Sequence, residues 1–66
     1  MQTKYFQSKK GNWKIEVSGE ENSAHIRCTG AVPAGVRHSV ELKENSGMVN
    51  TFKNLEFIAK MLVWQG

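Results

Sequence analysis

The sequence predicts an α+β fold in which a four-stranded antiparallel β-sheet, a meander, carries one C-terminal α-helix on one face. Two observations indicate this architecture. Apolar and polar residues alternate through the first part of the chain, as in half-buried strands, and the apolar spacing then changes to that of a helix. Strands joined by short turns pair as a meander, and a helix can cover one face of such a sheet. The 66 residues suit one small domain, residues 1–66.

The N-terminal hairpin carries the clearest local pattern. Residues 13–18 alternate between apolar and polar side chains, and residues 4–8 form a short strand before them. Residues 9–12 lie between the two strands, and Gly11 supplies the positive φ that a hairpin turn needs. We therefore predict that the first two strands pair as an antiparallel hairpin.

The register of this hairpin decides which aromatic ring faces the core. A two-residue or a four-residue loop sets Phe6 opposite Ile15, whereas a three-residue loop sets Tyr5 there. The sequence leaves both registers open. We favour Phe6 on the core side because the tyrosine hydroxyl tolerates a wet face better.

Two more strands are expected after the hairpin. A polar turn over residues 18–23 leads to a third strand over residues 24–29, and a loop with the only proline spans residues 30–35. A fourth strand is expected over residues 36–43, closed by a turn over residues 44–47. The expected core positions of these two strands are Ala24, Ile26, Cys28, Val36, His38, Val40 and Leu42.

The final segment has the period of a helix. From Phe52 the apolar residues recur at helical spacing, so we predict a helix that runs to about Trp64. Asn50 or Thr51 is the expected N-cap. One broad face is expected to pack on the sheet, and it consists of Phe52, Leu55, Ile58, Ala59, Leu62 and Val63.

A second apolar stripe on the same helix lies well away from that face and consists of Phe57, Met61 and Trp64. One helix on one sheet cannot bury both faces, and an exposed row of aromatic and methionine side chains marks an interface. The alternative is that the helix ends early, or that the N-terminus or the loop over residues 30–35 folds over the stripe. Self-association through the helix is the simplest form of the interface, because two-fold dimers dominate among oligomers.

The charge of the chain is mildly basic, with nine Lys and Arg against six acidic residues and a net charge of +3. Lys9 and Lys10 are expected at the hairpin tip. The outward strand positions hold Lys14, His25, Arg27, Arg37 and Lys43, diluted by Glu16 and Glu41. Basic side chains interleaved with an aromatic one suit a nucleic acid, with Tyr5 or Trp13 stacked on bases. The alternative is a solubilising edge, since lysines commonly protect sheet edges.

Residue constellations for catalysis or metal binding are missing. His25, His38 and Cys28 are the only soft metal ligands, and His25 and Cys28 point to opposite faces of one strand. Two ligands do not make a zinc site. The chain has no Asp to orient a histidine, and residues 30–35 match no phosphate-binding glycine pattern. We expect no enzymatic activity, no metal and no cofactor.

The sequence also bears on the compartment. The longest apolar run, residues 61–64, is far shorter than a membrane span, and the N-terminus has no apolar signal region. The lone Cys28 fits a reducing compartment. We expect a cytoplasmic protein with no membrane partner.

The expected element order, four strands and then one helix in a short chain, is similar to that of the single-stranded-DNA-binding proteins of the positive cofactor 4 type. The resemblance implies a dimer formed through the helix and nucleic acid bound on the sheet. It covers the order of elements and no residue motif, so no site residue is carried over. Short phage-encoded inhibitors of host proteins also have one compact sheet, one helix and no catalytic residues.

We therefore expect a non-catalytic binding module that binds nucleic acid, single-stranded nucleic acid included, as a homodimer. The candidate contacts are Lys9, Lys10, Lys14, Arg27, Arg37 and Tyr5. The alternative is an inhibitor or accessory protein that docks on a protein partner, with aromatic side chains as anchors. Its candidate contacts are Phe57, Met61 and Trp64.

Overall fold

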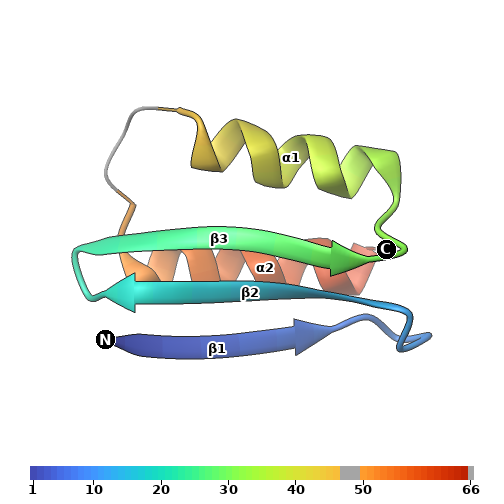
Figure 1. Cartoon of the computed structure of the whole chain (residues 1–66), viewed down its shortest axis with the longest axis horizontal. Coiled ribbons are helices and arrows are strands. Elements are labelled where there is room, and N and C mark those ends of the chain that lie inside the picture. The colour runs from blue at the N-terminus through green and yellow to red at the C-terminus, as the bar shows by residue number, and fades with distance from the viewer. Residues whose placement is uncertain (47–49, 66) are drawn as a thin grey trace.

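The computed structural model describes residues 1–46 and 50–65, and within them three strands precede two helices (Figure 1). The sheet is antiparallel, and its strands lie in the order β1 (Gln2–Gln7), β2 (Trp13–Glu20) and β3 (Ser23–Gly30). The helices are α1 (Ala34–Glu44) and α2 (Phe52–Gln65). α2 packs across one face of the sheet, whereas α1 lies along the outer side of β3. The α+β class is confirmed, but the described sheet has three strands instead of four.

The hairpin of β1 and β2 has the register that sets Phe6 opposite Ile15. Phe6 is half-buried on the side of α2, and Tyr5 faces the opposite side of the sheet, as we favoured. At the turn Gly11 has a φ of +75°. The buried Ser8 holds this turn together, because its amide donates to the Trp13 carbonyl at 3.0 Å and its Oγ accepts from the Gly11 amide at 3.1 Å.

The predicted fourth strand, residues 36–43, is wrong, because all of these residues lie within α1. Val36 and Val40 are buried, and a spacing of four residues fits the period of a helix as well as that of a strand. The helical choice agrees with Pro33, which stands just before the first turn and whose carbonyl accepts from the Arg37 amide at 2.9 Å. The expected turn over residues 44–47 lies partly outside the described residues.

This correction moves several side chains away from their expected places. His38 and Leu42 were expected in the core but are exposed on α1. Arg37, Glu41 and Lys43 belong to α1 and not to the outward face of a strand. The element order on which the resemblance rested is therefore not the order that this chain adopts.

The C-terminal helix is confirmed and begins as predicted. Thr51 caps it, since its Oγ1 accepts a hydrogen bond from the Asn54 amide at 3.1 Å. α2 buries Leu55 and Ala59 completely against the sheet. The buried apolar core consists of Trp13, Ile15, Val17, Ala24, Ile26, Val36, Val40, Phe52, Leu55 and Ala59, and Cys28 packs half-buried at its margin.

The outer edge of β3 is covered by the part of the chain that follows it. The Ile26 amide donates to Oε2 of Glu44 at 3.0 Å, and Oε1 of the same carboxylate lies 2.9 Å from Nδ1 of His25. The Ala24 amide donates to the Asn50 carbonyl at 3.0 Å. Backbone groups that would otherwise attract another strand are thus paired within the chain.

Candidate binding surfaces

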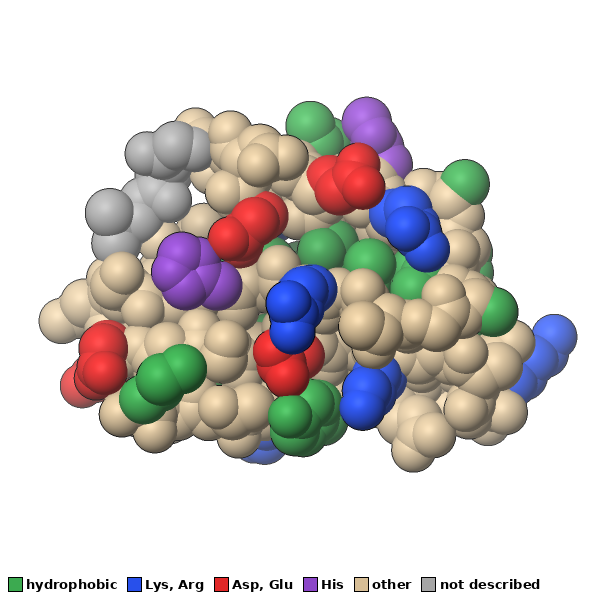
Figure 2. Space-filling view, in the orientation of Figure 1, with side chains coloured by type: hydrophobic (Ala, Val, Ile, Leu, Met, Phe, Trp, Pro, Cys, Tyr) green, Lys and Arg blue, Asp and Glu red, His purple; other side chains and the backbone are tan. Residues whose placement is uncertain are grey.

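One face of the sheet is covered by neither helix, and we call it the open face. It turns toward the viewer in Figure 2, while α2 lies behind the sheet. Strand pairing and side-chain alternation place eleven residues on it: Thr3, Tyr5, Gln7, Lys14, Glu16, Ser18, Glu20, Ser23, His25, Arg27 and Thr29. The open face is therefore polar, with one aromatic ring and charges of both signs.

Tyr5 is the centre of a small charged cluster on the open face. Its side chain is 57% exposed, and Nζ of Lys14 lies 4.9 Å from the centroid of its ring. The pKa of Tyr5 is raised above 10.0, because its hydroxyl donates a hydrogen bond to the carboxylate of Glu16, directly opposite on β2, and because the Glu16 charge disfavours the phenolate. Nη2 of Arg27 lies 3.6 Å from Oε1 of Glu16. The Glu16 carboxylate thus lies between the phenol of Tyr5 and the guanidinium of Arg27.

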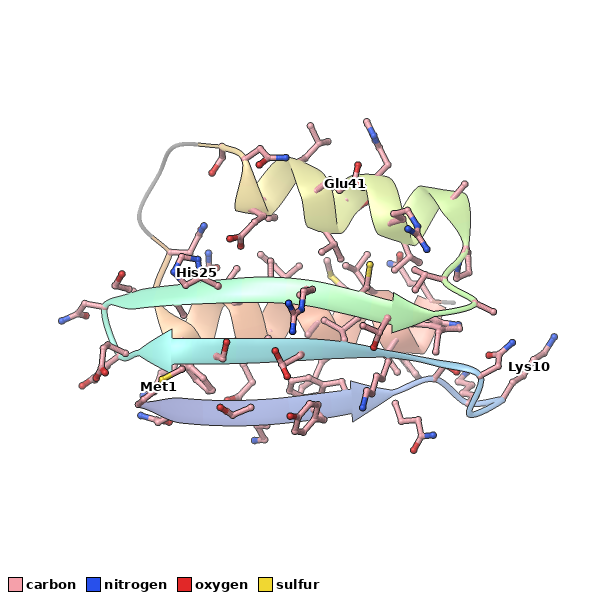
Figure 3. All side chains as sticks on the ribbon, viewed as in Figure 1. Met1, Lys10, His25 and Glu41 are labelled. Atoms are coloured by element: carbon pink, nitrogen blue, oxygen red, sulfur yellow. The ribbon has the colours of Figure 1, made fainter. Side chains whose placement is uncertain are left out.

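The six predicted nucleic-acid contacts do not share one surface. Tyr5, Lys14 and Arg27 lie together on the open face. Lys10 projects from the hairpin tip, at the end of the molecule opposite Met1 (Figure 3). Lys9 turns toward the side of α2.

Arg37 reaches the margin of the open face from α1. It lines a hollow of about 410 Å³ between α1 and β3, together with Arg27 and the carboxylates of Glu41 and Glu44. Apolar side chains show at the bottom of this hollow in Figure 2. Because Arg37 is on a helix, strand alternation could not place it there, and its nearness to Arg27 was missed.

The stripe on α2 remains uncovered. Phe57, Met61 and Trp64 are 65%, 41% and 76% exposed. The helix runs past Trp64 to Gln65, and neither β1 nor the loop before α1 covers these side chains, so the three ways of hiding the stripe are not realised. Whether it contacts a partner stays a prediction.

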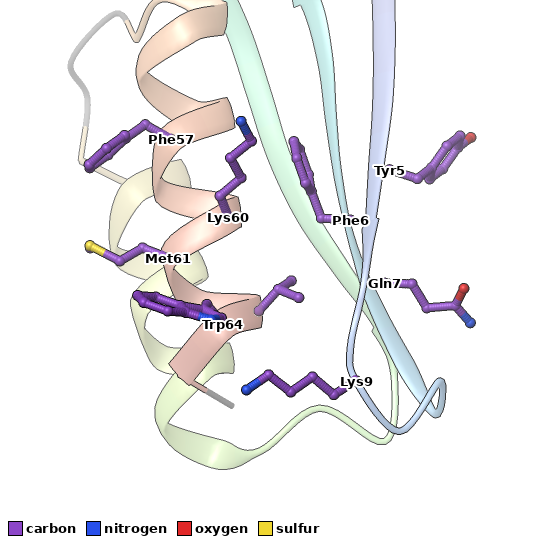
Figure 4. Close-up of a pocket in the computed structure, with 9 residues that line it drawn as sticks. Tyr5, Phe6, Gln7, Lys9, Phe57, Lys60, Met61 and Trp64 are labelled. Atoms are coloured by element: carbon purple, nitrogen blue, oxygen red, sulfur yellow. The ribbon is translucent and has the colours of Figure 1, made fainter.

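The stripe borders a groove of about 650 Å³ between β1 and α2 (Figure 4). The groove is mainly apolar, with Phe6 from β1 and Val63 from α2 added to the stripe, and Lys9 and Lys60 at its margins. Sequence reasoning missed Phe6 as a member of this surface. Phe6 could have been predicted on this surface only from the hairpin register, because that register decides which aromatic ring turns toward α2.

The histidines and the cysteine lie apart from one another. His25 pairs with Glu44 at the β3 edge, His38 is exposed on α1, and Cys28 lies on the opposite face of β3 from His25. Residues 1–46 and 50–65 contain no group of three His, Cys, Asp or Glu side chains arranged to hold a metal ion. In the same residues no helix has the length and hydropathy needed to cross a membrane.

Comparison with known proteins identifies no relative of this chain. No protein-family model, no curated protein and no solved structure matches this chain.

Proposed function

We propose that the chain is a non-catalytic binding module that holds single-stranded nucleic acid on its open face. The observation that carries this proposal is an exposed aromatic ring, Tyr5, flanked by the cations of Lys14 and Arg27 on a sheet face that neither helix covers. Single-strand-binding surfaces combine these two elements, stacking rings and cations that follow the backbone. A ring available for stacking favours a strand with free bases over a closed duplex.

Each side chain then has its own role in binding. Tyr5 stacks on one base, while Lys14 and Arg27 contact phosphates on either side of it, and Lys10 extends the track at the hairpin tip. Glu16 opposes the phosphates, and its pairing with Arg27 reduces this repulsion. The net attraction is small, which predicts weak and strongly salt-dependent binding.

Fluorescence anisotropy of a labelled oligothymidylate of about 12 nucleotides tests the proposal. Three phosphate contacts predict a slope of about −2 when the logarithm of the affinity is plotted against that of the salt concentration. Tyr5→Ala should cost about 1–3 kcal/mol of binding free energy. Glu16→Gln should strengthen binding, because it removes a charge that repels phosphate.

Lys53→Ala is the matched control for Lys14→Ala, since Lys53 is an exposed lysine on α2, behind the sheet. The proposal requires that the loss of Lys14 weakens binding and the loss of Lys53 does not. No binding at low salt, or equal losses in the two variants, contradicts it.

A second candidate function is association with a protein surface, and the exposed stripe of α2 favours it. Phe57 and Trp64 are the kind of large rings that anchor protein interfaces. Trp64→Ala should abolish such an association without unfolding the domain. Leu42→Ala, which truncates an exposed apolar side chain on α1, is the matched control.

A further inference from the structure

The outer edge of β1 differs from that of β3 because no described segment lies along it. The Ser8 amide donates to the Trp13 carbonyl, and inward and outward backbone groups alternate along an antiparallel strand. The backbone N–H and C=O groups of Thr3, Tyr5 and Gln7 therefore point away from β2. β3 obeys the same alternation, since its outward Ala24 and Ile26 amides are the ones bonded to the later chain.

This open edge lacks the features that usually prevent strands from pairing. β1 has six residues, contains no proline, and carries one charged residue, Lys4. The charge of Lys4 is paired within the chain and does not repel an incoming strand as a free lysine would, because its Nζ lies 3.4 Å from Oε2 of Glu56 on α2. The groove adjoins the same edge, with Phe6 and Lys60 beside it, whereas Phe57, Met61 and Trp64 point to the far side of α2 (Figure 4).

We propose that a second copy of this chain occupies this edge, by antiparallel pairing of β1 with the partner's β1. The inference rests on the second candidate function, association with a protein surface, and names the partner. Two-fold symmetry brings the same edge to both sides, so each outward group meets a complementary one. The product is a continuous sheet of six strands, three from each copy.

The register follows from backbone direction and charge. With Tyr5 on the two-fold axis, all three outward residues pair: Tyr5 with the partner's Tyr5, and Thr3 with the partner's Gln7 in both directions. Lys4 then lies opposite the partner's Phe6. If the axis moves from Tyr5 to Lys4, Lys4 lies directly opposite the partner's Lys4, and the like charges repel. If the axis moves to Phe6, Thr3 has no paired residue in the partner's β1.

The helices are complementary in the same arrangement. Glu56 lies beside Lys4, and Lys60 lies one turn later, on the groove beside Phe6. With the two-fold axis at Tyr5, Lys4 lies opposite the partner's Phe6. Glu56, which lies beside Lys4, therefore faces the partner's Lys60, which lies beside that Phe6. The two helices therefore face each other across the axis with charges of opposite sign.

The spacing of the helices leaves room for side chains between them. α2 packs chiefly on β2, so the two copies of α2 are separated by three strand spacings, or about 14 Å. Helices in direct contact lie about 8–10 Å apart, so large side chains must fill the gap. Phe6 and Lys60, which lie between α2 and β1 in Figure 4, are side chains that face this gap.

The second copy also contributes to the open face. Pairing on the Tyr5 axis brings two Tyr5 rings side by side at the centre of the six strands, each with its own Lys14. A single nucleic-acid strand crossing the axis meets both rings.

Disulfide cross-linking through a cysteine placed on the two-fold axis tests the proposed register directly. In a Cys28→Ala background, Tyr5→Cys should form an intermolecular disulfide under mild oxidation, because directly paired residues lie about 5.5 Å apart. Lys4→Cys and Phe6→Cys are the matched controls, since each would be cross-linked only in one of the two shifted registers. Cross-linking at either control and not at Tyr5 overturns the proposed register.

Light scattering after size exclusion provides the independent measurement. The unmodified chain should have twice the chain mass, and Thr3→Pro, which removes one outward N–H, should have the single mass with an unchanged circular dichroism spectrum. A single mass for the unmodified chain at high concentration overturns the inference. If Trp64→Ala instead dissociates a complex that is not two copies, the second candidate function stands and this inference fails. Oligonucleotide affinity, measured separately, decides the first proposed function.

Discussion

The two outer edges of the sheet both present outward N–H and C=O groups, but only the β3 edge is covered by another part of the described chain. Along β3, a carboxylate from α1 and a carbonyl from the connection to α2 accept the outward amides. Along β1, no described segment takes that part, and an apolar groove lies beside the strand. The comparison teaches that two acceptors from the later chain, the Glu44 carboxylate and the Asn50 carbonyl, can close an edge to other chains, whereas an edge without such acceptors leaves a route to association.

The largest expected effect comes from detaching α1 from β3. Val40 is 3% exposed between them, so Val40→Asp buries an unpaired charge and should cost about 3–5 kcal/mol of the free energy of unfolding. Denaturant titration followed by circular dichroism measures the loss. Leu42→Asp, on the exposed side of the same helix, should leave the midpoint nearly unchanged. Equal losses would show that α1 does not depend on this contact.

A smaller effect isolates the bond that covers the β3 edge. Glu44→Ala removes the acceptor of the Ile26 amide and should cost about 1–3 kcal/mol of the free energy of unfolding. It should also make the Ile26 amide exchange with solvent as fast as the outward amides of β1 do in the dilute protein. Glu41→Ala, one turn earlier on α1, is the control. A slow Ile26 amide in Glu44→Ala would mean that the helix itself covers the edge.

How far the sequence predicted the molecule depends on how many structures each pattern fits. The hairpin and α2 could be predicted because a glycine turn between two strand patterns, and a long helical spacing from Phe52, each indicate one kind of element, although the hairpin register stayed open. Val36 and Val40 fit a strand and a helix alike, so α1 was misread. The stripe needed only α2, whereas the groove also needed the register of Phe6 and the closeness of β1 to α2, which are tertiary facts.

The smallest expected effect concerns the cluster on the open face. Glu16 raises the pKa of Tyr5 by hydrogen bonding and by charge, so the phenol should lose its proton at a higher pH than an ordinary tyrosine does. Because the pKa is raised in the folded state, any stability that it contributes is present below pH 10.0 and falls as the pH rises above it. Tyr5 is the only tyrosine, so absorbance at alkaline pH follows it alone.

Glu16→Gln should lower the pKa of Tyr5 toward the ordinary value, because the charge and the strongest acceptor are lost together. Glu20→Gln, at the far end of β2, should leave the titration unchanged. A Tyr5 titration that is insensitive to Glu16 would remove the cluster on which the open face is built.

Amide hydrogen exchange at two protein concentrations tests the central claim most directly. The outward amides of Thr3, Tyr5 and Gln7 should exchange fast in dilute protein and slowly in concentrated protein, when the partner's β1 covers them. The Ala24 and Ile26 amides should be slow at both concentrations, because their acceptors belong to the same chain. If the three β1 amides are slow in dilute protein, or fast at every concentration, the contrast between a closed edge and an edge that a second copy closes is contradicted.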